Sequence, residues 1–110
     1  MLKDEIMHVD EFTSENITPY VGSMFRLAAP DGQTYELQLV RVLKTMDQHV
    51  DQHRSRTRDT FSMYFQGPLQ PYLPQATYSF SHDALGGPHH IFIVPTSRGQ
   101  EGFLYEAVFT

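Results

Sequence analysis

Residues 23–46 read SMFRLAAPDGQTYELQLVRVLKTM, two alternating segments separated by the sequence APDG at 29–32. Apolar side chains at every second position are typical of half-buried β-strands. In the turn, proline presets φ, aspartate bonds locally and glycine accepts a positive φ. The stretch therefore predicts a β-hairpin with strands at about 23–28 and 34–46. The apolar positions change phase near 39–41, which predicts a bulge there or burial on both sides.

The same alternation continues through the rest of the chain. We expect further strands at 60–66, 76–81, 89–94 and 103–109, and the last of them reads FLYEAVF. The segment 89–94 is apolar on both faces, which is typical of a central strand. Six strands with short connections favour an up-and-down antiparallel sheet, rolled into a small barrel or sandwich. The expected fold class is therefore mainly all-β.

The N-terminal residues differ from this body in charge. Residues 1–16 carry one lysine against five carboxylates, a net charge of −4, whereas the whole chain carries −5. The remaining residues are therefore nearly neutral. A neutral body disfavours nucleic-acid binding, which needs a basic face to neutralise phosphates.

A short helix is expected within residues 10–20, with Asp10 or Ser14 as its cap and Pro19 as its limit. We therefore divide the chain into an acidic arm with this helix, residues 1–22, and a β domain, residues 23–110. The helix should lay four apolar side chains over one end of the sheet: Phe12, Ile17, Tyr20 and Val21.

The composition excludes several classes of protein. The 110 residues contain no cysteine, which removes disulfides, thiolate metal sites and cysteine nucleophiles and fits a reducing compartment. The longest apolar run, IFIV at 91–94, is far shorter than the ~20 residues of a membrane helix. The first residues also lack the basic start and apolar stretch of a signal peptide. We expect a soluble cytoplasmic protein with neither a membrane nor a nucleic-acid partner.

The segment 47–59 contains the strongest pattern for a chemical site, Asp47-x-His49-x-Asp51-x-His53. On a strand these side chains would share one face, and imidazole and carboxylate groups bind zinc. The simpler interpretation is a solvated hairpin tip, which lacks the surrounding groups that hold metal ligands. We therefore predict no metal and no cofactor. His49, Asp51 and His53 remain the candidates of an alternative function, a small ligand- or metal-binding protein or an enzyme.

Three arginines alternate in the same segment: Arg54, Arg56 and Arg58. Alone they would suggest contact with phosphate or carboxylate groups. The aspartates of the segment balance their charge, however, so two interpretations remain. The segment is either a self-paired charged tip or a docking loop for a partner protein.

Histidines also occur within the predicted strands. His82 has Ser81 and Asp83 beside it but no nucleophile-elbow motif, so we expect it to bond the backbone of the following turn rather than act as a base. His89 and His90 are adjacent and should point to opposite faces of a strand, which prevents them from binding one ion together.

Glu106 is a carboxylate among apolar neighbours in the last predicted strand. A carboxylate in such a place is expected to be partly buried and paired, and Arg26 and Arg41 are the candidate partners.

The loop 67–75 is the preferred protein-contact surface. Prolines stiffen it, it carries no charge, and its contact candidates are Tyr72, Leu73 and Gln75. An aromatic and an aliphatic side chain on a pre-stiffened loop have the character of an interface hot spot. We expect Tyr72 and Leu73 to lie outside the core.

Six motifs recur in the order and spacing of a known pattern: VGSMF at 21–25, FQGP at 65–68, LPQATY at 73–78, His82 with Leu85-Gly86, IFIVP at 91–95 and YEAVF at 105–109. From about residue 21 to its end, the chain resembles an uncharacterised family of small bacterial β domains. The resemblance implies a structural or accessory role in tail-like assemblies, because such domains occur beside phage-tail-collar-like proteins. It brings no catalytic residue. We expect a non-catalytic domain that binds a second copy of itself or an assembly component.

Overall fold

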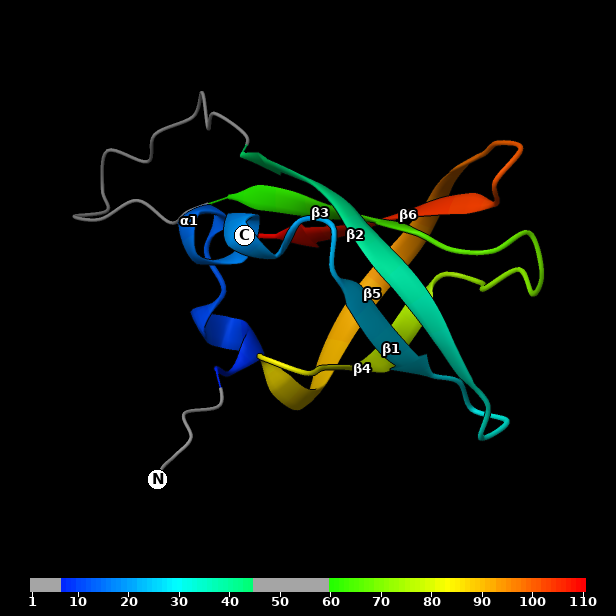
Figure 1. The fold of residues 1–110 in the computed structure, drawn as a ribbon, viewed down its shortest axis with the longest axis horizontal. Helices are drawn as coiled ribbons and strands as arrows, with labels where there is room; N and C mark the ends of the chain where they lie inside the picture. The colour runs from blue at the N-terminus through cyan, green and yellow to red at the C-terminus, as the bar shows by residue number, and fades with distance from the viewer. Residues whose placement is uncertain (1–6, 45–59) are drawn as a thin grey trace.

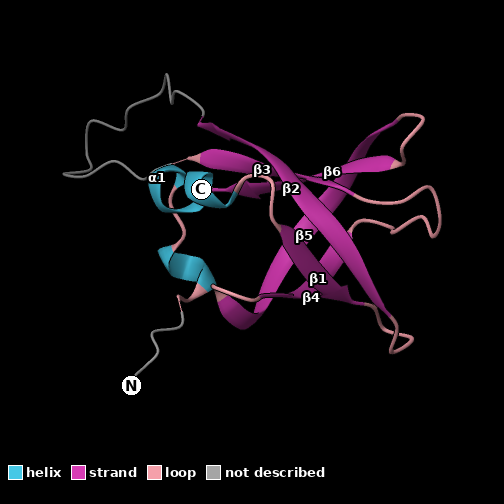
Figure 2. Ribbon diagram, viewed as in Figure 1, coloured by secondary structure: helices cyan, strands magenta, loops and turns pink. Residues whose placement is uncertain are grey.

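The computed structural model describes residues 7–44 and 60–110. Three short helical segments come first: η1 (Val9–Glu11), α1 (Ser14–Ile17) and η2 (Thr18–Tyr20). Six strands follow: β1 (Met24–Ala28), β2 (Thr34–Lys44), β3 (Phe61–Gln66), β4 (Ala76–His82), β5 (Gly86–Arg98) and β6 (Phe103–Phe109). The strands form the wall of a barrel, and the helical segments lie at one end of it (Figure 1, Figure 2).

The sheet is a closed antiparallel barrel with the strand order β1-β2-β3-β6-β5-β4, and β1 pairs with β4 to close it. The structure thus confirms the expected fold class and selects the barrel over the sandwich. The up-and-down order is wrong, because β3 pairs with β6 and not with β4. The loop 67–75 carries the chain from β3 to β4 past β6 and β5. Its three prolines lack the N–H groups that a direct hairpin between β3 and β4 would need.

The hairpin of β1 and β2 is confirmed, with Leu27 opposite Tyr35. Its turn has Gly32 at φ +87, and the Gly32 N–H donates to the carbonyl of Ala29 at 3.0 Å. The register of β2 against β3 shifts between Leu39 and Arg41, so the bulge is also confirmed. After the bulge Val42 packs against the core and Arg41 is exposed.

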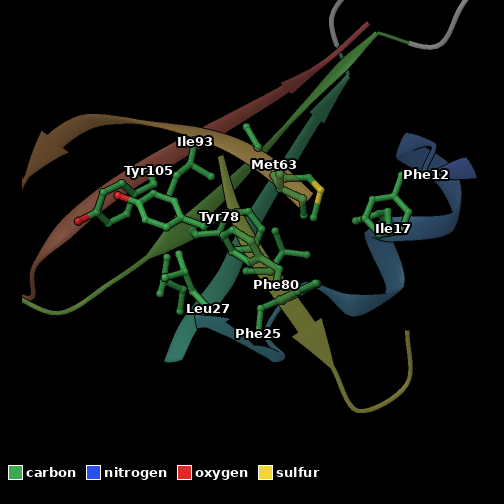
Figure 3. Close-up of a cluster of buried hydrophobic side chains, with 14 of the residues drawn as sticks. Phe12, Ile17, Phe25, Leu27, Met63, Tyr78, Phe80, Ile93 and Tyr105 are labelled. Atoms are coloured by element: carbon green, nitrogen blue, oxygen red, sulfur yellow. The ribbon is translucent and has the colours of Figure 1, made fainter. Parts of the chain in front are cut away.

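The barrel interior is filled by the alternate side chains of all six strands (Figure 3). Phe25 of β1 meets Phe65 of β3 edge-on, with ring centroids 5.3 Å apart. Phe65 in turn lies 5.1 Å from Phe80 of β4. Side chains of the wall thus meet across the interior, as in other small barrels.

The helical segments close one end of the barrel, with Phe12 and Ile17 buried in the core. Val21 does not contribute as expected, since 42% of it is exposed. The cap of α1 is Thr13 rather than Asp10 or Ser14. Its hydroxyl accepts from the Asn16 N–H at 3.1 Å, and the Asn16 side chain accepts from the Thr13 N–H at 2.8 Å. This reciprocal pair is a capping box in which asparagine replaces the usual glutamate.

Strand β5 is longer than the expected 89–94 at both ends, and it is not buried on both faces. Ile91 and Ile93 point into the core, whereas Phe92 between them is 49% exposed. The outer wall of a closed barrel faces solvent, so an apolar side chain at such a position is not evidence of a central strand.

Candidate functional site

The loop 67–75 lies at the end of the barrel away from α1 (Figure 1), and hydrogen bonds hold it at both ends. At its start the Gly67 N–H donates to the carbonyl of Phe103 at 2.8 Å. Toward its end the Leu73 N–H donates to the buried Tyr105 hydroxyl at 3.0 Å, and the Tyr78 hydroxyl donates to the carbonyl of Pro74 at 2.7 Å. The loop is therefore part of the folded body.

The outer side of this loop presents Tyr72, which is 53% exposed, and Leu69, which is 42% exposed. The Tyr72 ring stands edge-on to Phe103, with centroids 5.1 Å apart. The guanidinium of Arg98 lies 5.9 Å from the centroid of the same Phe103 ring. Gln75, at the end of the same loop, is also exposed. Tyr72 and Phe103 thus form an aromatic pair at the surface of a loop that hydrogen bonds hold in place.

The expectation that Leu73 lies outside the core is wrong, because only 4% of it is exposed. Strands do not cover the end of a barrel, so a loop side chain must fill it. Leu73 does this at the loop end, as Phe12 and Ile17 do at the other end. Tyr72 therefore faces solvent, whereas Leu73 supports the loop from inside.

The candidate metal ligands and docking arginines of the segment 47–59 lie outside the described residues: His49, Asp51, His53, Arg54, Arg56 and Arg58. Within residues 7–44 and 60–110, no group of three or more histidine and acidic side chains is placed to hold a metal ion.

His82 bonds the backbone of the turn after β4, as predicted. Its Nδ1 accepts the N–H of Ala84 at 2.9 Å and that of Leu85 at 3.3 Å. Its Nε2 lies 2.9 Å from the Ser23 hydroxyl, which itself donates to the carbonyl of Tyr20 at 2.6 Å. The ring thus ties β4 and its turn to the segment between η2 and β1.

A serine hydroxyl beside a histidine nitrogen resembles a hydrolytic pair, but the protonation is the reverse of what catalysis needs. Because Nδ1 accepts two N–H groups, the proton of the neutral ring must sit on Nε2. Nε2 then donates to Ser23 and has no lone pair with which to remove the hydroxyl proton. The contact between Ser23 and His82 is therefore structural.

The same environment lowers the pKa of His82. Burial, which penalises the charged ring, is the main cause; nearby Asp83 opposes it, and Arg26 and His89 add to it. Below about pH 6.5, the ordinary pKa of a histidine, the His82 ring is protonated in the unfolded chain. In the folded chain the ring stays neutral to a lower pH.

We therefore expect stability to be greatest above about pH 6.5 and to fall as the pH decreases below it, levelling off once the folded ring is also protonated. Urea denaturation across this range measures the slope. His82→Gln should remove its contribution, whereas His90→Gln, at an exposed position, is the matched control. An unchanged slope in His82→Gln would contradict this assignment.

His89 and His90 face opposite sides of β5, as expected. The buried His89 lies with Nε2 2.9 Å from the carbonyl of Leu85, and its ring is 5.2 Å from that of Phe12. His90 is exposed, and its Nδ1 is 3.3 Å from the Ser79 hydroxyl. The two rings make separate structural contacts.

Glu106 is half-buried on the outer wall and is bound by two hydroxyls. Ser62 donates to Oε2 at 2.7 Å and Tyr64 donates to it at 3.2 Å. Burial, followed by the Glu106 carboxylate, raises the pKa of Tyr64. The expected pairing with Arg26 is wrong, because Arg26 binds Asp83 at 2.9 Å.

Arg41, the other candidate partner of Glu106, lies over the Tyr64 ring, 5.8 Å from its centroid. The sequence gives no signal for Ser23, Ser62, Tyr64 or Tyr105 as hydrogen-bond partners. Each binds a residue 32 to 59 positions away, and only the tertiary structure brings them together.

The described residues define a small closed β-barrel in which hydrogen bonds fix the loop 67–75 at both ends. The family model of the Domain of unknown function (DUF6916) matches residues 12–109, and the chain belongs to this family. No curated protein and no solved structure matches it. Among the described residues, no helix is long and apolar enough to cross a bilayer.

Proposed function

We propose that this protein is a non-catalytic protein-binding β-barrel whose contact surface is the loop 67–75 around Tyr72. One observation supports the proposal above all: a tyrosine that is 53% exposed stands on a loop held by the Tyr105–Leu73 and Tyr78–Pro74 hydrogen bonds. A partner that binds such a loop pays little entropy to order it. Tyrosine is also among the residues that dominate binding energy at interfaces.

The wider setting of the proposal is an accessory or assembly role in a bacterial, phage-tail-like structure within the cytoplasm. Its support is the resemblance of the motifs to domains that occur beside phage-tail-collar-like proteins. The tautomer of His82 supports a role without catalysis, because it removes the pair of Ser23 and His82 from consideration as a nucleophile and its base. Gln75 belongs to the same contact surface, and Arg54, Arg56 and Arg58 are proposed as a second docking segment.

The test compares what a tagged full-length chain retains from its native cells with what the variant Leu69→Ser/Tyr72→Ala retains. The variant should stay folded, because both side chains are exposed. We expect its affinity for the purified partner to fall at least about tenfold, as for a hot-spot residue.

Met24→Ser is the matched control, since Met24 is similarly exposed, at 43%, but lies on β1. Leu73 is left unchanged because its loss would disturb the core. A folded variant that binds its partner as tightly as the wild type would show that the loop is only a connector.

The alternative is a small ligand- or metal-binding protein, or an enzyme, that uses His49, Asp51 and His53. The same preparations distinguish it. A saturable rise of the melting temperature with zinc, lost in His49→Ala/His53→Ala, would favour the alternative, because a ligand that binds only the folded state stabilises it.

A further inference from the structure

The outer wall formed by β2, β3 and β6 carries two neighbouring rows of side chains. In the first row, Leu43 pairs with Ser62 and Ser62 pairs with Val108. In the second row, Arg41 pairs with Tyr64 and Tyr64 pairs with Glu106. We call this surface the β3 face and define it by these six residues, of which Ser62 is itself buried, at 3% exposed.

Apolar side chains are exposed on the β3 face. Val108 is 59% exposed and Leu43 is 38% exposed. Phe92 of β5, 49% exposed, extends the same surface, because it lines one hollow together with Val108. The water-facing side of an antiparallel sheet is ordinarily polar. Val108 and Phe92, which adjoin at this hollow, form an exposed apolar patch of the kind that marks interaction sites.

The charges of the β3 face are arranged symmetrically about β3. Arg41 stands on one side of Tyr64 and Glu106 stands on the other. Arg41 lies over the Tyr64 ring, and Glu106 is held by the hydroxyls of Ser62 and Tyr64. Within the described part of the chain, neither charge has an oppositely charged partner. Each copy thus presents one cation and one anion on the two strands that flank β3.

We propose that the β3 face binds the β3 face of a second copy of this chain, with a two-fold axis running along β3. Such an axis lays β2 of one copy over β6 of the other without shifting the rows. Leu43 then meets Val108 of the second copy, and Arg41 meets Glu106 of the second copy. The two Tyr64 rings lie at the axis, and each contact occurs twice.

Both rows are self-complementary, and this property identifies a second copy of the chain as the partner of the β3 face. A two-fold interface requires that each residue meet its counterpart in the same surface, and here apolar meets apolar and cation meets anion. A different partner would need no such symmetry. The closed barrel also has no free edge strand among its six described strands, so copies cannot associate by adding a strand to an open edge of this sheet. The loop 67–75 takes no part, and the proposal does not depend on it.

The test reverses the charge of Arg41 or of Glu106 in the full-length chain. Sedimentation velocity over a range of concentrations measures the oligomeric state of each variant. The wild type should form a dimer. Arg41→Glu places two anions at each charged contact and Glu106→Arg places two cations, so each variant alone should dissociate at least about tenfold more readily. An equimolar mixture of the two should recover a dimer, since every contact in the mixed pair again joins a cation to an anion.

Val108→Lys tests the apolar row independently, in case Glu106→Arg disturbs the hydroxyls around it. Its side chain is exposed, so the variant should fold and be monomeric. Met24→Lys, the same kind of change on β1, should remain a dimer. Circular dichroism establishes that each variant is folded.

A monomeric wild type, or dimers that persist in Val108→Lys and Arg41→Glu, would overturn the proposal. A mixture of folded charge variants that stays monomeric would overturn the two-fold pairing of Arg41 with Glu106. The loop variant Leu69→Ser/Tyr72→Ala should still form the dimer, so failure of either proposal leaves the other distinguishable.

Discussion

Replacing Gly102 by alanine is expected to cost about 4 kcal/mol or more of folding free energy, which few single substitutions reach. Gly102 has φ +139, where L side chains are rarely found. An added Cβ would also lie 1.9 Å from the carbonyl oxygen of Gly67 and 2.7 Å from the carbonyl carbon of Pro68. These are backbone atoms at the start of the loop 67–75, so relief of the clash requires moving the loop.

Gly99→Ala is the matched control, because a Cβ at this position in the same turn meets nothing within 4 Å. Urea denaturation of the two variants and the wild type measures the difference. We expect Gly99→Ala to remain within about 1 kcal/mol of the wild type. If Gly102→Ala were equally stable, the close approach of the β5–β6 turn to the loop 67–75 would be wrong, and with it the fixed geometry proposed for Tyr72.

Replacing Phe25 by alanine is expected to cost about 3–5 kcal/mol, the range for a buried phenylalanine. Phe25 is completely buried, and its ring contacts Phe65 at 5.3 Å, Phe80 at 6.4 Å and His82 at 4.6 Å between centroids. Its removal leaves a cavity where β1, β3 and β4 face one another, and the aromatic contacts are lost together with the buried area.

The corresponding control is Phe92→Ala, the same chemical change at a position that is 49% exposed on the outer wall. We expect this variant to lose less than about 1 kcal/mol. Thermal and urea denaturation at low protein concentration compare the two. Equal losses would mean that the alternation of β1 and β5 between interior and solvent is assigned incorrectly.

Both substitutions affect the proposed contact surface as well as the stability of the fold. The loop 67–75 is held by Tyr105 from inside the barrel and by the β5–β6 turn at Gly102 from outside. Its shape is therefore a consequence of the core. Variants that weaken the core should also weaken partner binding, so the function is best tested with Tyr72 and Leu69, which lie outside it.

Much of the local structure follows from the sequence. Alternation at 23–28 and 103–109 predicted the strands β1 and β6, and the phase change at 39–41 predicted the bulge in β2. The backbone bonds of His82 were also predicted, because a histidine before a glycine-containing turn has N–H groups within reach. These features depend on neighbours within a few residues.

The candidate site was predicted less completely. Tyr72 is exposed as expected, whereas Leu73 is buried, because a loop side chain fills the end of the barrel. Glu106 is bound by the hydroxyls of Ser62 and Tyr64 instead of by an arginine. The first difference arises from the closure of the barrel, and the second from the strand that lies beside β6.

The sequence by itself determined that six strands form and where the turns and the bulge occur, because the side-chain period of two is a property of the local backbone. Only the tertiary structure decided that β6 inserts between β3 and β5 and that β1 closes onto β4. Alternation is the same whichever strand lies alongside, so it carries no information about pairing. The pairing alone places Arg41 and Glu106 on either side of Tyr64, and Ser23 beside His82.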